Sequence, residues 1–427
     1  MLEEKIVNVV DIQYGKNSIE GDKTIINDTE SALCELIDNA IDAGSTSIEV
    51  TFNENSLNKL TKITIKDNGR GMDEEDLVNF FGIGTETNFV ETSIGHYGFG
   101  ANFSLKFLSK SVRLTTKKKF QTNKIIAKWL LDSDNFQKYQ FENRKNNDDD
   151  DYDQSYTEII CYLHDNVDNI DLHLDFEKDK SKKESRFGKL KSRLSARYKY
   201  LIDNNNEYKN VNISFNKTEL TPIDPLYENS DLTKEWPENG SFLVNLIDKN
   251  GLPFTSKINY KGFYVSDNGK KNARNQFDRQ TGTGLPIAHQ GCYLNLQCRG
   301  TGRYLTLGEG IWGGESTNPA YNSGRIEFEF DKSCRDLFGL GANKSKPSFK
   351  LNRADENSKL ILDKIIDFRS WISKTYKDNL AENKKDKNNK KSKQDKIILS
   401  LEEIDFDILT PIEALNILNE MRNELLS

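Results

Sequence analysis

Apolar and polar residues follow a helical period between Ser31 and Gly44. At about 100° per residue, apolar side chains gather on one face and acidic and amide side chains on the other. The apolar face has Leu33, Leu36, Ile37, Ala40 and Ile41, and the polar face has Glu35, Asp38, Asn39 and Asp42. Asp28 or Thr29 can cap the start of this helix, and Gly44 can end it with a left-handed backbone. Taken alone, the polar face reads as an ordinary solvated surface.

Two segments after this helix alternate apolar and polar residues, which is typical of strands. They are STSIEVTF (45–52) and TKITIKDNGRGM (61–72). The second strand is expected to end at Asp67, and Gly69 and Gly71 follow it. A carboxylate at the carboxyl end of a strand, followed by glycines, is a ligand-site geometry in sheet proteins.

A glycine-rich run, GHYGFG (95–100), precedes the helix-like segment ANFSLKFLSK (101–110). Backbone N–H groups in such a run, together with the start of a helix, can bind phosphates. Taken alone, the run reads equally well as a flexible turn. Residues 72–94 include Gly82-Ile83-Gly84-Thr85 and read either as a hinged lid or as a loop between helices.

Together, ELIDNAIDAG (35–44), DNGRGM (67–72) and GHYGFG (95–100) resemble the GHKL superfamily of ATPases. This superfamily comprises gyrase, the heat-shock chaperone of the ninety-kilodalton class, histidine kinases and MutL. The resemblance covers roughly residues 1–170 and implies a Bergerat-type α/β sandwich that binds ATP and Mg²⁺. The residue types suit phosphoryl transfer, which depends on an oriented water and a charge-neutralising metal more than on covalent catalysis.

The resemblance also implies a role for each motif residue. Glu35 would be the general base for the attacking water, Asn39 would coordinate magnesium, and Asp67 would accept the adenine amino proton. Thr157, in SYTEIICYL, stands where the superfamily has a threonine beside that aspartate, although Tyr156 replaces the usual glycine. The expected nucleotide-binding residues are Asp38, Asn39, Asp67, Gly69, Gly71, Met72, Gly95, His96, Tyr97, Gly98, Phe99, Gly100 and Thr157.

From about Val211 the pattern changes to strands separated by loops rich in glycine and asparagine. The strand-like segments are VNISF, GSFLVNLID, KINYKGFYVSD, GCYLNLQCRGTGRYLTLG and SGRIEFEFD, and helix-like SKLILDKIIDFRSWISKTY closes the region. We expect an α+β domain over 211–378, which resembles the transducer of ATPases in the MutL, gyrase and MORC branch. That resemblance implies a lysine that reaches the γ-phosphate, with Lys344 in GANKSKPSFKLN the first choice and Lys346 the second.

Charge is unevenly distributed in this chain, whose formal net charge is −7. Residues 171–210 hold a basic helical connector, SKKESRFGKLKSRLSARYKY, and residues 379–398 read as a disordered basic linker. Each could follow a phosphate backbone or simply be solvated. Residues 399–427 predict a short amphipathic helix after Thr410-Pro411, suited to self-association, to docking on a partner or to packing on its own domain.

The overall composition fits an intracellular enzyme of several domains. A chain of 427 residues exceeds what one core usually supports, and its five cysteines lack paired metal spacing. The sequence shows no membrane-spanning stretch and no secretory signal, so we expect a cytoplasmic protein. We predict an Mg²⁺-dependent ATPase whose nucleotide state closes a homodimeric clamp on DNA, most like prokaryotic MORC-like or MutL-like proteins.

Two other functional classes remain open at this stage. A chaperone-like ATPase that acts on protein clients would use the same nucleotide motifs. A histidine kinase is less favoured, because its ATPase module lies at the C-terminus after a phospho-accepting helix. Here the module is N-terminal, and the four histidines include no acceptor motif.

Overall fold

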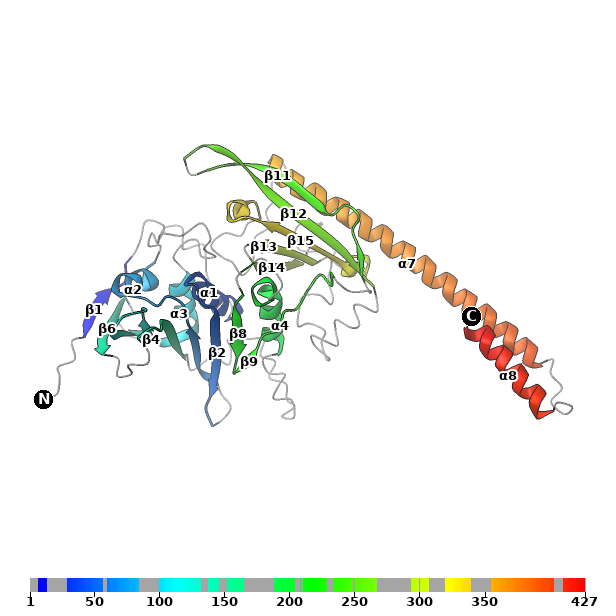
Figure 1. The fold of residues 1–427 in the computed structure, drawn as a ribbon. Coiled ribbons are helices and arrows are strands. Elements are labelled where there is room, and N and C mark those ends of the chain that lie inside the picture. The colour runs from blue at the N-terminus through cyan, green and yellow to red at the C-terminus, as the bar shows by residue number, and fades with distance from the viewer. Residues whose placement is uncertain are drawn as a thin grey trace. The chain divides into compact units, whose positions relative to one another are not determined.

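The computed structural model describes residues 7–13, 29–56, 60–83, 100–131, 137–145, 152–164, 188–203, 208, 210–228, 233–248, 250–266, 293–298, 300–306, 319–338, 355–402 and 410–426. The chain divides into two compact units, Met1–Phe368 and Arg369–Ser427. The first unit contains two sheets with their helices, and the second unit is helical (Figure 1). The predicted α+β fold class, with helices at the C-terminus, is confirmed.

The first sheet has nine strands in the order β1-β6-β5-β4-β7-β3-β2-β8-β9. Their bounds are β1 (Asn8–Asp11), β2 (Ser47–Glu54), β3 (Leu60–Asp67), β4 (Ser109–Lys117), β5 (Asn123–Leu130), β6 (Lys138–Lys145), β7 (Tyr156–Leu163), β8 (Asn212–Phe215) and β9 (Thr218–Glu219). The accompanying helices are α1 (Thr29–Asp42), α2 (Glu74–Phe81), α3 (Gly100–Leu108), α4 (Gly188–Arg197) and α5 (Lys199–Ile202).

One face of this sheet and the apolar faces of its helices enclose the first core. The alternation predicted for β2 and β3 is present, because Ile48, Val50, Ile63 and Ile65 are all buried. The apolar side chains of α1 are buried in the same core, and its last turn ends at Gly44 with φ of +82°. A left-handed glycine at this position confirms the predicted helix end.

The second sheet has six strands in the order β10-β12-β15-β13-β14, and β11 also pairs with β12. Their bounds are β10 (Thr233–Glu235), β11 (Gly240–Ile247), β12 (Pro253–Val265), β13 (Tyr293–Cys298), β14 (Thr301–Thr306) and β15 (Gly324–Phe330), with 3₁₀ helices η5 (Pro319–Ser323) and η6 (Lys332–Phe338) beside them. Its core is aromatic: the Trp236 ring lies 5.3 Å from Phe368 and 5.6 Å from Tyr260, centroid to centroid. Gly262 lets these rings approach, since a Cβ there would lie 2.5 Å from Phe368.

The segment VNISF (211–215) is a strand, as predicted, but its assignment to the second domain was wrong. As β8 it pairs in parallel with β2, from Ser47 opposite Asn212 to Val50 opposite Phe215. Phe215 is fully buried in the first core, where its ring stacks on Phe52. Alternation predicts a strand but not its partner, and the partner here is more than 160 residues away in the sequence.

The lysine-rich run between 379 and 398 is helical rather than a disordered linker, because it lies within α7 (Glu356–Glu402). The run contains no glycine or proline, and its many lysines are good helix formers, so low hydrophobicity did not exclude a helix. The helix predicted after Thr410 is α8 (Pro411–Leu426). Thr410 caps it, since Glu413 N–H donates to the threonine hydroxyl and the glutamate carboxylate accepts from Thr410 N–H.

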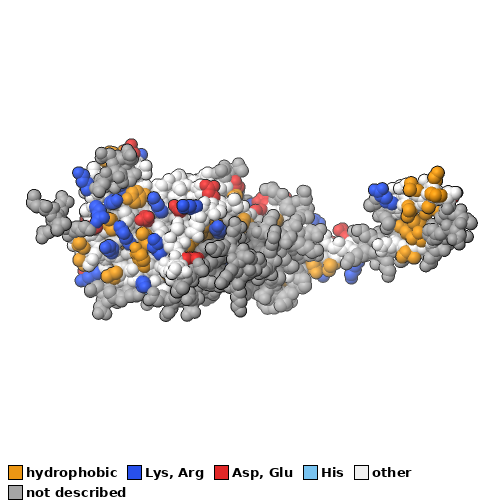
Figure 2. Space-filling view, turned by 90° about the horizontal axis from the view of Figure 1, so that it is seen from below, with side chains coloured by type: hydrophobic (Ala, Val, Ile, Leu, Met, Phe, Trp, Pro, Cys, Tyr) orange, Lys and Arg blue, Asp and Glu red, His pale blue; other side chains and the backbone are white. Residues whose placement is uncertain are grey.

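Several large apolar side chains of α8 are exposed. Ile412, Leu415 and Leu418 are each more than half exposed, and Figure 2 shows apolar side chains gathered on this part of the helical unit. Within the described ranges, no helix is both long and apolar enough to cross a membrane. Cys34, Cys161, Cys298 and Cys334 are buried and form no disulfide bond among the described residues.

Candidate nucleotide-binding site

Asp67 is the last residue of β3, where the strand gives way to the glycine turn. Its side chain is 6% exposed, and its Oδ1 atom accepts hydrogen bonds from the Ser45 hydroxyl at 2.9 Å and from Gly69 N–H at 2.8 Å. Burial raises the pKa of Asp67, and the hydrogen bonds from Gly69 and Ser45 oppose that shift. Among the described residues, nothing binds the other carboxylate oxygen, Oδ2, so it remains for a ligand donor.

The two glycines of the turn are required by close packing. A Cβ at Gly69 would lie 2.7 Å from the Ser45 hydroxyl and 2.8 Å from Asp67 Oδ1. Gly71 has φ of +68°, and a Cβ there would lie 2.0 Å from the carbonyl oxygen of Lys117 on β4. The turn therefore approaches β4 more closely than any other residue type would allow.

Thr157 lies directly beside Asp67, since these residues are opposite each other in the β3–β7 register. It is 5% exposed, and its hydroxyl lies 3.2 Å from the hydroxyl of Thr116 on β4. The Thr116 hydroxyl also accepts a hydrogen bond from Met72 N–H at 2.9 Å. The threonine pair thus holds the DNGRGM turn in place beside the predicted adenine site.

The start of α2 anchors the same turn from its other end. Asp73 caps this helix and forms a capping box with Asp76, and Lys118 binds both carboxylates. The backbone N–H of Asp76 and the Lys118 ammonium lower the pKa of Asp73 to about 2. The turn between β3 and α2 is therefore fixed at both ends.

Glu35 lies against the start of α3, the helix that follows the glycine-rich run. Its side chain is 6% exposed, and a Cβ at Gly100 would lie 2.0 Å from Glu35 Oε2. Asn39 follows Glu35 by four residues, so both lie on the same side of α1, and Asn39 is partly exposed. The reading of this polar face as a solvated surface is wrong for Glu35, because its carboxylate is buried.

Asp38, which was expected to bind nucleotide, is engaged elsewhere. It is fully buried, with Oδ2 lying 3.0 Å from Arg197 Nη2 and Oδ1 accepting a 2.8 Å hydrogen bond from the Tyr198 hydroxyl. Both carboxylate oxygens thus bind side chains of the connector, Arg197 and Tyr198. Helix periodicity put Asp38 and Glu35 on one polar face but did not predict that different elements would cover them.

Part of the predicted site lies outside the residues that the structure describes. This applies to Gly95, His96, Tyr97, Gly98, Phe99, Lys344 and Lys346. Conversely, sequence reasoning missed Ser45 and Thr116, which orient the Asp67 carboxylate and the turn. No motif marked them, because a serine after a helix and a threonine in a strand are common.

The site would supply few protein ligands to a metal ion. Within the described part of the chain, no group of three or more histidine, cysteine, aspartate or glutamate side chains could hold one. Mg²⁺ usually keeps several waters and binds one or two protein oxygens together with substrate phosphates. A partly exposed Asn39 amide beside the expected phosphate position fits that preference.

Comparison with known proteins finds sequence similarity in the first part of the chain. Residues 26–157 match the family described as "Histidine kinase-, DNA gyrase B-, and HSP90-like ATPase". A stretch of 57 residues is 47% identical to the DNA mismatch repair protein MutL of Listeria monocytogenes serovar 1/2a. That stretch covers 13% of this chain and only 9% of the length of the MutL relative.

Two solved structures are similar over longer stretches. The ATPase region of Saccharomyces cerevisiae topoisomerase II has a TM-score of 0.40 and 11% identity, covering 80% of this chain and 84% of that one. The N-terminal domain of a DNA repair protein has a TM-score of 0.45 and 13% identity, covering 86% of this chain and 98% of that one.

Proposed function

We propose that this chain, whose residues 26–157 form an ATPase domain of the GHKL superfamily, binds ATP with Mg²⁺ and hydrolyses it to control closure of a homodimer. The observation that carries the proposal is the Asp67 carboxylate, buried at a strand end with one oxygen fixed and the other without a partner among the described residues. ATP binding and turnover by the purified chain, with and without Mg²⁺, test it. A chain that binds no nucleotide would contradict it.

Asp67 would select adenine. Its Oδ2 atom would accept a proton from the adenine amino group, while Ser45 and Gly69 hold Oδ1. A guanine carbonyl at that position would face a second acceptor in a buried site, which costs binding free energy. Gly71, Met72 and Thr157 would lie beside the base.

Glu35 would orient and deprotonate the attacking water, because its carboxylate lies at the start of α3 near the expected phosphates. Asn39 would hold Mg²⁺, which supplies neutralisation of phosphate charge. Backbone N–H groups from Gly95 to Gly100, with the N-terminal end of α3, would bind the phosphates.

Gly100→Ala tests the position of Glu35. The added Cβ would lie 2.0 Å from Glu35 Oε2, the flexible end of a side chain, so we expect the carboxylate to move and the fold to persist. Hydrolysis should slow on the order of 10²-fold, the effect of a misplaced catalytic group. Turnover and melting temperature are measured together, with Gly240→Ala as control, since a Cβ there makes only ordinary contacts. Unchanged turnover would mean that this contact does not position the base.

The lysine from the transducer-like domain would contact only the γ-phosphate. Lys344→Ala is therefore expected to reduce hydrolysis while leaving ADP affinity unchanged, and Lys346→Ala is the matched control. Steady-state turnover and ADP titration measure both. If Lys346→Ala slows hydrolysis and Lys344→Ala does not, Lys346 makes the γ-phosphate contact instead of Lys344.

The clamp would act on DNA, as expected for a MORC-like or MutL-like protein. Three cations of the connector are already paired within the chain: Arg193 with Glu30, Arg197 with Asp38 and Lys199 with Asp224. The other basic residues of SKKESRFGKLKSRLSARYKY would then contact the DNA. They are Lys182, Lys183, Arg186, Lys189 and Lys191.

A non-hydrolysable ATP analogue should shift the chain toward a dimer, whereas ADP should not, because only a ligand with different affinities for the two states shifts their populations. Light scattering measures this shift. DNA binding should be independent of sequence and fall steeply with salt. A monomer in every nucleotide state, without DNA binding at low salt, would favour the chaperone-like alternative.

A further inference from the structure

Four consecutive residues at the junction of α4 and α5 contact two different parts of the first unit. Arg197 and Tyr198 contact helix α1, which packs on the first sheet. Lys199 and Tyr200 contact strand β15 of the second sheet. We call residues 197–200 the junction segment. Three of its side chains are almost fully buried, at 7% for Arg197, 0% for Tyr198 and 6% for Lys199.

On one side, the junction segment holds Asp38. Arg197 and the Tyr198 hydroxyl each bind one of its carboxylate oxygens, at 3.0 Å and 2.8 Å. Asp38 directly precedes Asn39 and lies one turn from Glu35 on α1. A displacement of the junction segment would therefore displace the part of α1 that carries both residues.

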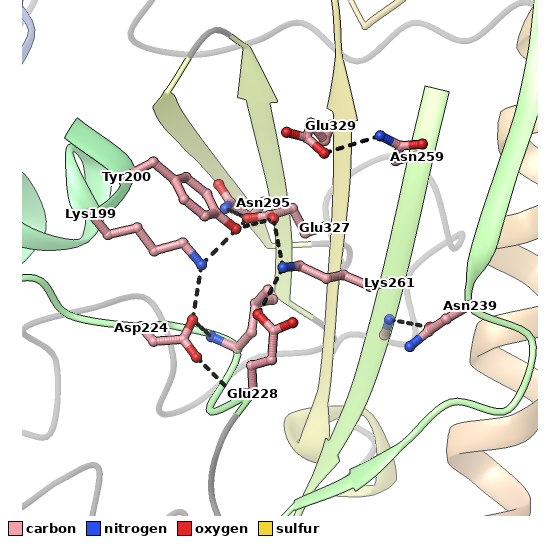
Figure 3. A network of polar contacts seen from close by, with 12 residues as sticks. Lys199, Tyr200, Asp224, Glu228, Asn239, Asn259, Lys261, Asn295, Glu327 and Glu329 are labelled. Carbon is pink, nitrogen blue, oxygen red and sulfur yellow. Dashed lines mark hydrogen bonds and ion pairs between the residues drawn. The ribbon is translucent and has the colours of Figure 1, made fainter. Parts of the chain in front are cut away.

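On the other side, the junction segment holds Glu327 on β15, a central strand of the second sheet (Figure 3). The Tyr200 hydroxyl donates to Glu327 Oε1 at 2.6 Å, and Lys199 Nζ lies 3.7 Å from Oε2. Glu327 is 2% exposed, and Asn295 and Lys261 on neighbouring strands also bind it. Burial and the Glu327 charge raise the pKa of Tyr200, so its hydroxyl stays protonated.

Lys199 has a second partner that fixes its position. Its Nζ atom lies 2.9 Å from Asp224 Oδ1, and Asp224 also accepts from the backbone N–H groups of Leu226 and Glu228. Buried charges with several partners tolerate little movement, because a displaced charge would lose hydrogen bonds that water cannot replace. The junction segment is therefore held firmly on both sides.

We propose that the junction segment couples the second sheet to the nucleotide site, and that Asp38, Arg197, Tyr198, Tyr200 and Glu327 are positioning residues for ATP hydrolysis. The inference rests on the proposed ATPase function. Movement of β15 relative to the first sheet would be transmitted through Glu327 and the junction segment to Asp38, and so to Glu35 and Asn39. None of these positioning residues needs to touch the nucleotide.

Tyr200→Phe is the sharpest test, because it removes one hydroxyl on the side remote from α1. Tyr208→Phe is the matched control: its hydroxyl donates to Glu329 Oε1 at 2.8 Å, on the same strand, but it lies outside the junction segment. We expect Tyr200→Phe to lower kcat by roughly fivefold or more, a typical coupling between sites, with unchanged ATP affinity. Tyr208→Phe should retain the wild-type kcat.

Hydrogen exchange on the full chain without nucleotide gives a second readout. In Tyr200→Phe, the amides of α1 should exchange faster than in the wild type, and in Tyr208→Phe they should not. Unchanged kcat and unchanged α1 exchange in Tyr200→Phe, or equal effects in both variants, would overturn the coupling. A wild-type chain that neither binds nor hydrolyses ATP would refute the proposed function instead, while the exchange data would still decide the coupling.

Discussion

Glu35→Ala is expected to slow ATP hydrolysis by roughly 10²–10⁴-fold, as removal of a general base usually does. ATP binding should stay nearly intact, because the adenine contacts and the phosphate-binding backbone are unchanged. ATP should therefore accumulate on the enzyme. The carboxylate is buried against Gly100 at the start of α3, so no bulk water can substitute for it in the same geometry.

Single-turnover kinetics and filter binding of labelled ATP separate the two effects. Glu30→Gln is a matched control, since Glu30 lies on the same helix but forms a partly buried ion pair with Arg193. It should leave both rate and affinity unchanged. Wild-type turnover in Glu35→Ala would remove Glu35 from the catalytic role.

Asp67→Asn is expected to weaken ATP binding by ~1–3 kcal/mol, or about 5- to 150-fold, without destabilising the fold. The asparagine oxygen can still accept from Ser45 and Gly69, but an NH₂ group would replace Oδ2 and face the adenine amino group, donor against donor. Titration with labelled ATP measures the affinity. Asp11→Asn is the control, because Asp11 lies on the edge strand β1, where it pairs with Lys138 at the surface, outside the proposed adenine contacts.

Asp67→Asn also tests how the stability of the fold depends on pH. The pKa of Asp67 in the folded protein lies above its ordinary value of 3.8, so the folded state binds more protons than the unfolded state between those two pKa values. The contribution of Asp67 to stability is then largest below pH 3.8 and declines as pH rises through the folded pKa. Asp67→Asn should lack this decline in denaturation experiments.

Equal ATP affinity for Asp67→Asn and the wild type would defeat the assignment of Asp67 as the adenine-binding residue.

The sequence by itself determined the local elements of the site. The helical period of α1, its end at Gly44, the strand ending at Asp67 and the helix after Gly100 were all predicted, because periodicity and capping depend on near neighbours. The second α+β region was also predicted from alternation alone. The glycines at 69 and 71 were identified, although the reason for them is contact with Ser45 and Lys117.

Only the tertiary structure decided which partners these elements have. Asp38 and Glu35 share one polar face in the sequence, yet the connector covers Asp38 and α3 covers Glu35. Strand β8 joined the first sheet, and Ser45 and Thr116 became supports of the site, through contacts between segments far apart in the chain. Such pairings depend on sheet register and on buried polar groups finding partners, and neither leaves a pattern in the local sequence.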